Sequence, residues 1–246
     1  MLSQEAQIEE IRRSDPDFKN VRQDFLLWDT IRIGENVPQN VNGWYTSFTA
    51  MLADSNEQSF FDQRQESEAG SAYTNMKKKT GLDWPMIITD LGIQFMYPDP
   101  VNADLFDGNR TESKMFTDVV PKDVSCSLYT GGGDDKILTF LPEMAPYGFG
   151  TSGQQMGSIE TFSSVLSNGV PIAGNRFIFK NMAIKLPKDI STSIKINFAK
   201  PARDLLALMA TVKPIIFANG EYKNEAKIRI AMRGMRDIQQ VGNYRR

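Results

Sequence analysis

The chain has 246 residues, of which 41% are hydrophobic and 24% are charged, and its formal net charge is −2. This length accommodates one large β domain or two small ones, and the composition is ordinary for a folded protein. No apolar run approaches the roughly 20 residues that a membrane-spanning helix needs. The sequence contains no histidine and one cysteine. These counts exclude Ser-His-Asp and Cys-His catalysis, histidine-ligated zinc and an intrachain disulfide framework.

The N-terminal segment predicts a short helix over residues 3–13. Ser3 is a suitable N-cap, Glu5 lies in the first turn, and Asp15 and Pro16 end the helix. A helix of this length is marginal in isolation, so we expect it to dock on another part of the protein. The segment lacks a basic start followed by an apolar core, which predicts no secretory signal and synthesis in the cytoplasm.

The next part of the chain predicts strands separated by turns. In Met86–Tyr97, the residues Ile87, Leu91, Ile93, Phe95 and Tyr97 share one parity, as in a half-buried strand. Residues 53–79 are polar and indicate an elaborated loop with some helix. Further strands are predicted at 25–33, 44–48, 124–129 and 136–141, the last two forming a hairpin around the glycine-rich turn 131–135.

Residues 174–198 predict two strands joined by a turn at Pro187–Asp189, which we interpret as a hairpin. The apolar parity changes within the first strand, so a β-bulge is expected near Lys180 and Asn181. A helix beginning at Pro201 and a strand at 215–217 follow. The last strand alternates through 228–232, with Gly234 as another candidate bulge. In total, about a dozen short strands and one or two short helices predict an all-β protein of jelly-roll type.

The sequence offers little that resembles catalytic chemistry, so we predict no enzyme and no cofactor. Asp134 and Asp135 are weak calcium candidates, since carboxylate oxygens suit hard cations, but exposed turn acids are the ordinary interpretation. Cys126 lies at an apolar parity of its strand, which predicts a buried structural thiol rather than a nucleophile.

Charge is unevenly distributed along the chain. From Asn175 onward there are 15 Lys+Arg and 5 Asp+Glu, a net charge of +10, so the preceding residues carry −12. One interpretation is a basic face toward nucleic acid, an anionic membrane or an acidic neighbour. The other is that strands expose alternate lysines for solubility and that acidic faces pair with basic ones.

Several features together resemble the major capsid proteins of tailless, membrane-containing icosahedral bacteriophages. These are the N-terminal helix at Ser3–Arg13, the β-rich body without catalytic residues, the strand-helix unit IKINFAKPARDLLALM and the basic last strand KIRIAMRGMRDIQQV. The resemblance is one of organisation over most of the chain. It implies a double jelly roll, assembling as homotrimers of pseudo-sixfold outline into a virion shell. Its partners would be copies of itself, other virion proteins and an internal membrane, with no specific nucleic-acid recognition.

With this resemblance, the chain divides into an N-terminal helix or arm at 1–20, a first barrel at 21–141, a linker at 142–157 and a second barrel at 158–246. The arm would present Arg12 and Arg13 to the membrane or a partner. A basic assembly surface would carry Lys185, Lys188, Lys195, Arg229 and Arg233.

Three alternatives stay open. The first is a single jelly roll with a long N-terminal region, in a minor virion protein or another assembly protein. It is open because the sixteen strands of a double jelly roll are many for a chain of this length. A ligand- or carbohydrate-binding β-sandwich is the second, and it would need exposed aromatics on one sheet face, with Trp28, Trp44 and Trp84 as candidates. The third is a histidine-free enzyme that uses carboxylates.

Overall fold

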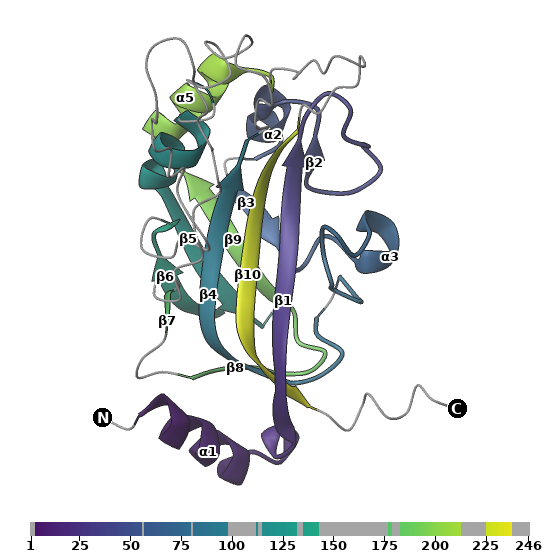
Figure 1. Ribbon diagram of the computed structural model, residues 1–246, viewed down its shortest axis with the longest axis vertical. Helices are drawn as coiled ribbons and strands as arrows, with labels where there is room; N and C mark the ends of the chain where they lie inside the picture. Colours follow the sequence, from purple (N-terminus) through teal and green to yellow (C-terminus); the bar gives the residue numbers. More distant parts are fainter. Residues whose placement is uncertain are drawn as a thin grey trace, which may run out of the picture.

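The body of the protein is a sandwich of two β-sheets, with helices at its two ends (Figure 1). This is the computed structural model of the chain, and it describes residues 3–55, 57–79, 81–97, 112, 115–131, 135–142, 177–178, 183–212 and 225–237. The coarse prediction of a predominantly β protein with a sandwich architecture is confirmed. Helix is more abundant than predicted, with four α-helices in the described ranges.

The larger sheet has six strands in the order β2-β1-β10-β4-β7, and β8 also pairs with β4. Their bounds are β1 Val21–Ile33, β2 Trp44–Tyr45, β4 Met86–Met96, β7 Phe177–Ile178, β8 Ile184–Leu186 and β10 Ala226–Asp237. β10 is antiparallel to both β1 and β4, so the last described strand occupies the centre of the sheet.

The smaller sheet has four strands in the order β3-β9-β5-β6. Their bounds are β3 Glu57–Phe60, β5 Val124–Thr130, β6 Asp135–Phe140 and β9 Thr192–Phe198. All three pairings in this sheet are antiparallel. The predicted hairpin at 124–141 is confirmed as β5–β6, and Gly131 supplies the positive φ of +71° in its turn.

A single large hydrophobic core lies between the sheets. Alternation places every second apolar side chain inward, as with Ile194, Ile196 and Phe198 of β9, and Ile228 and Ile230 of β10. All five are buried. The alternation of apolar residues in the sequence therefore identifies the faces of the two sheets that pack against each other.

The strands pair in a nested order along the chain. β1 pairs with β10, β3 with β9, β4 with β7 and β8, and β5 with β6, all antiparallel. Successive pairs alternate between the larger and the smaller sheet. Early strands thus lie beside late strands in both sheets.

The predicted hairpin within 174–198 is wrong. β8 joins the larger sheet and β9 joins the smaller one, so the turn between them crosses from one sheet to the other. Asp189 adopts a φ of +57° in this turn, and its N–H donates to the carbonyl of Leu82 at 2.9 Å. Alternation shows that a segment is a strand but does not identify its partner. The bulge expected near Lys180 and Asn181 lies outside the described residues.

The double jelly roll is not confirmed by the described strands. Strands from the two ranges predicted as separate barrels, 21–141 and 158–246, lie side by side in both sheets: β10 between β1 and β4, and β9 between β3 and β5. They therefore form one sandwich. The predicted linker 142–157 lies outside the described residues except for Pro142.

An irregularity lies at the predicted position Gly234, but its extra residue is Thr89 of β4 and not a residue of β10, and it corrects the parity assigned to β4. The β10–β4 register shifts between Arg233 and Gly234, so that Asp90 and Ile88 face consecutive residues of β10. A Cβ on Gly234 would lie 2.0 Å from the carbonyl oxygen of Ile87. Because of the extra residue, Ile87 belongs to a small outer cluster instead of the main core.

α1, α2 and α5 occupy the ends of the sandwich. α1 (Gln4–Ser14) lies at one end, and α2 (Phe48–Asp54) and α5 (Lys200–Met209) lie at the other (Figure 1). α1 and α5 begin near the predicted residues. The strand predicted over 44–48 stops at Tyr45, because Ser47 caps α2 by accepting from the N–H of Ala50. A short α3 (Glu66–Ala69) and β3 occupy the predicted loop 53–79, and the predicted strand 215–217 lies outside the described residues. None of the described helices is long and apolar enough to cross a membrane.

Candidate functional site

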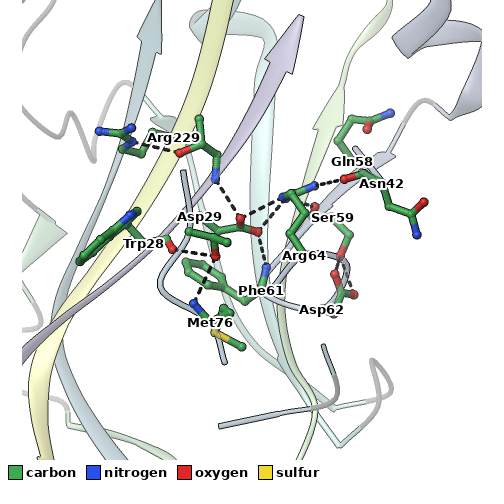
Figure 2. A network of polar contacts seen from close by, with 12 residues as sticks. Trp28, Asp29, Asn42, Gln58, Ser59, Phe61, Asp62, Arg64, Met76 and Arg229 are labelled. Atoms are coloured by element: carbon green, nitrogen blue, oxygen red, sulfur yellow. Dashed lines mark hydrogen bonds and ion pairs between the residues drawn. The ribbon is translucent and has the colours of Figure 1, made fainter. Parts of the chain in front are cut away.

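The most highly organised polar site is a buried ion pair between Asp29 of β1 and Arg64 (Figure 2). Both side chains have no exposed surface. Arg64 Nε donates to Asp29 Oδ1 at 2.9 Å, and Arg64 Nη2 donates to Oδ2 at 2.7 Å. The backbone N–H of Thr30 also donates to Asp29 Oδ1 at 2.9 Å, and the backbone N–H of Phe61 donates to Oδ2 at 2.8 Å. Each carboxylate oxygen of Asp29 therefore accepts two hydrogen bonds.

The rest of the Arg64 guanidinium binds backbone carbonyls. Nη2 donates to Ser59 at 2.9 Å and Nη1 donates to Asn42 at 3.1 Å. Gly43, with φ +74°, leaves the space for Nη1, since a Cβ there would lie 1.9 Å from it. The ion pair thus fixes three separate segments to one another: β1, the turn before β2 and the turn after β3. We call this ion pair the Asp29–Arg64 clamp. Its role is structural, because a carboxylate whose oxygens already accept four hydrogen bonds has little capacity to act as a base.

Two further polar contacts border this clamp. Ser59 Oγ lies 2.7 Å from both carboxylate oxygens of Asp62, and burial raises the pKa of the Asp62 carboxyl against the effect of that hydrogen bond. Tyr45 Oη contacts Asp54 at 2.8 Å and Gln58 at 2.5 Å. Burial and the Asp54 carboxylate raise the pKa of the Tyr45 hydroxyl, so it stays protonated and neutral.

A polar pocket of about 340 Å³ adjoins these residues and is lined by Asn42, Gly43, Asp54, Asp62, Gln63 and Lys79. Its two carboxylates already accept hydrogen bonds from protein hydroxyls. Within the described part of the chain, no group of three or more His, Cys, Asp or Glu is placed to hold a metal ion.

Asn75 covers the edge of β1 next to the clamp. Its side chain accepts from the N–H of Trp28 at 2.9 Å and donates to the carbonyl of Leu26 at 2.7 Å, and its own N–H donates to the carbonyl of Trp28 at 3.3 Å. These bonds replace those that a neighbouring strand would make. The uncovered length of an edge strand that could pair with another chain is thereby reduced.

The two arginines predicted to face a membrane or a partner differ in their surroundings. Arg12 turns back onto the body: Nε donates to the carbonyl of Val21 at 2.9 Å, Nη2 contacts Met235, and the side chain is 15% exposed and paired with Glu9. Arg13 is exposed. Arg12 is therefore engaged within the subunit, and a contact of Arg13 with a membrane or partner stays a prediction.

The five basic residues predicted to form an assembly surface are divided between opposite faces. Lys185, Arg229 and Arg233 project outward from the larger sheet, because their strand neighbours are in the core. Lys195 projects from the smaller sheet, and Lys188 is exposed in the turn between the sheets. They do not form one continuous surface. Asp135, at the start of β6, is exposed, and Asp134 lies outside the described residues.

Several charges of the basic C-terminal part pair with the acidic N-terminal part. Lys185 binds Asp15 at 2.9 Å, and Lys195 binds Glu57 at 3.1 Å. Arg229 donates to the hydroxyl of Thr30 at 3.0 Å. Because the nested pairing places late strands beside early ones, these contacts favour the interpretation that the charge asymmetry is partly neutralised inside the subunit.

The aromatic candidates for carbohydrate binding are engaged within the protein. Trp44 is 6% exposed and, with Tyr73, encloses the guanidinium of Arg32. The Trp28 indole N–H donates to the carbonyl of Ser71, and Trp84 packs edge-on against Phe25. Two of the tryptophans are half-buried, and the three do not form one stacking platform.

Cys126 is buried in the core, as predicted. Burial raises the pKa of its thiol, which disfavours the reactive thiolate. The Asp29–Arg64 pair, by contrast, was missed by sequence reasoning. A signal for it exists, since Asp29 occupies an inward position between Leu27 and Ile31, where a charge requires a buried partner.

Neither the family models, the curated proteins nor the solved structures with which the chain was compared contain a match.

Proposed function

We propose that this chain is a virion structural protein with a single jelly roll as its body, and that it assembles with copies of itself into an icosahedral shell. The observation that carries the proposal is the nested pairing, which alternates between two sheets. Taking β7 and β8 as one interrupted strand along β4, and leaving out the two-residue β2, the described residues form eight strands. An eight-stranded double-sheet sandwich is the jelly-roll arrangement.

The fold by itself does not select the function, because jelly rolls occur in viral capsid proteins, lectin domains and cupins. A histidine-ligated metal centre is excluded by the absence of histidine from the sequence. The tryptophans required for a carbohydrate platform are engaged with protein groups. Both observations favour the shell subunit among the three uses of the fold.

The mechanism of such a protein is self-association through its outer surfaces. A shell subunit needs a rigid body, which the core and the Asp29–Arg64 clamp supply. It also needs outward groups that remain free for neighbours. Lys188 and Arg233 are exposed and make no ion pair with the described residues, so we assign them to subunit contacts. The homotrimer is the assembly that a double jelly roll implies. For a subunit with a single sandwich, sedimentation has to measure how many subunits associate.

Purified protein should form closed shells, detected by negative-stain microscopy and by sedimentation velocity over a concentration series. Charge reversal at Lys188 and Arg233 together should abolish the shells while circular dichroism and thermal unfolding stay unchanged, because both side chains are exposed. Lys136→Glu, an exposed position on β6 of the other sheet, is the matched control and should retain assembly. A chain that remains monomeric at high concentration overturns the proposal, and equal loss in the control overturns the assignment of these two residues.

A further inference from the structure

α1 is attached to the sandwich by a hydrophobic cluster separate from the main core. Its buried members are Ile8 of the helix, Phe18, Val21 and Ile87, with Ile11, Ala183 and Met235 packed beside them. The helix lies across one end of the sandwich (Figure 1). Releasing α1 would expose this small cluster and leave the packing between the two sheets intact.

Specific polar contacts fix the position of the helix on the body. Gln4 Nε2 donates to the carbonyl of Thr89 at 3.1 Å, and the N–H of Ala183 donates to Gln7 Oε1 at 3.1 Å. Lys185 binds Asp15 at 2.9 Å, just after the helix. Each of these contacts joins the arm to strands far away in the sequence. None of them requires that the arm and the strands belong to the same molecule.

The connection between helix and sandwich is short and leaves room beneath the helix. Asp15 ends α1 in an extended conformation, and Pro16–Phe18 forms one turn of 3-10 helix before β1 begins at Val21. An open pocket of about 680 Å³ borders the contact between the helix and the body, lined by Gln7, Glu10, Ile11 and Ser14 of the helix and by Ile137, Ala183, Ile184 and Lys185 of the body. The helix is thus held by a small cluster beside open solvent, and a contact with few buried apolar residues opens at a lower cost than the main core.

We propose that α1 is an exchangeable arm: in the assembled state it leaves its own sandwich and docks on the same site of a second copy. This inference rests on the proposed function, since it concerns how neighbouring subunits are joined. The second copy is the occupant that the observations specify, because its site has the same cluster and the same Gln4, Gln7 and Asp15 partners. The helix carries its own N-cap and a favourable charge order, yet is too short to be stable undocked. Exchange of an identical element therefore links subunits without a new complementary surface.

The test is chemical crosslinking across the arm and its site. In the Gln7→Cys/Ala183→Cys variant, a short bis-maleimide joins the helix to whichever sandwich it occupies, and denaturing gels separate the products. Cys126 can remain, because it is buried and its thiol is unreactive. Assembled protein should give dimer and higher bands, whereas dilute monomer should give only an internally crosslinked chain.

The Ser127→Cys/Thr139→Cys variant is the matched control, since these residues face each other across the β5–β6 hairpin and should crosslink only within one chain. An Asp15→Cys/Lys185→Cys variant repeats the measurement at the second contact in case the first pair disturbs docking. Shells that contain only internally crosslinked chains overturn the exchange while leaving the shell proposal intact. Interchain products without shells support the exchange and overturn the shell. A strictly monomeric chain overturns both.

Discussion

At the scale of single residues, Asp29 and Arg64 show how a charged pair can organise a β-sandwich from inside. The carboxylate comes from an inward position of β1, and the guanidinium comes from the segment after β3. Two ion-pair hydrogen bonds and two carbonyl contacts satisfy Arg64, so neither charge is left uncompensated. Such a pair need not add much net stability, but removing one partner is costly.

We expect Arg64→Met to lower the free energy of unfolding by about 3–5 kcal/mol, because Asp29 would remain charged and buried without its partner. Urea unfolding followed by circular dichroism measures this. Combining Arg64→Met with Asp29→Leu should recover part of the loss. The matched control is Lys195→Met, which removes an exposed ion pair with Glu57 and should cost about 0–1 kcal/mol. Equal losses in Arg64→Met and Lys195→Met would contradict the clamp.

At the scale of elements, α1 packs on a cluster of its own beside the main core, and one ion pair fastens the chain where the helix ends. A hydrogen bond from Lys185 lowers the pKa of the Asp15 carboxyl below its ordinary value of 3.8. A depressed folded-state pKa means that this contact contributes stability above about pH 4, and that the contribution is lost as the pH falls through the folded-state pKa. Acid should therefore weaken this contact between the arm and β8.

The effect of Lys185 can be measured by NMR titration of the Asp15 carboxyl carbon. In Lys185→Met the pKa of Asp15 should rise toward its ordinary value, because the hydrogen bond and the positive charge are both removed. Lys188→Met is the control: it removes an exposed charge that has no contact with Asp15 among the described residues. If both variants raise the pKa of Asp15 equally, general surface charge is responsible, and a specific effect of the Lys185–Asp15 ion pair is refuted.

At the scale of the whole molecule, nested pairing makes early and late strands depend on each other. β10 pairs with β1 over nearly its whole length and with β4 on its other side, so the larger sheet lacks a centre until the last described strand is in place. Pairings of such large sequence separation are slow to form. The same arrangement brings Lys195 of β9 beside Glu57 of β3.

Two truncations should separate the arm from the body. A chain without residues 1–14 should still unfold cooperatively, with a lower Tm, because the cluster under α1 is separate from the main core. A chain ending at Glu225 lacks β10 and should lose cooperative unfolding. Thermal scans followed by circular dichroism distinguish the two cases. Cooperative unfolding of the chain without β10 would show that the sheet does not depend on its central strand.

By itself the sequence determined the strands β1, β4, β5, β6, β8, β9 and β10 and the helices α1 and α5, because alternation, capping and turn residues are local properties. Ser3, the glycine turn after Thr130, Pro201 and the irregularity at Gly234 were all predicted from such signals. Apart from the β5–β6 hairpin, only the tertiary structure decided which strands pair with one another. It separated β8 from β9, united the two predicted barrels in one sandwich and brought Asp29 to Arg64. The physical reason is that a strand has the same pattern whichever strand lies beside it, whereas pairing depends on contacts between residues far apart in the chain.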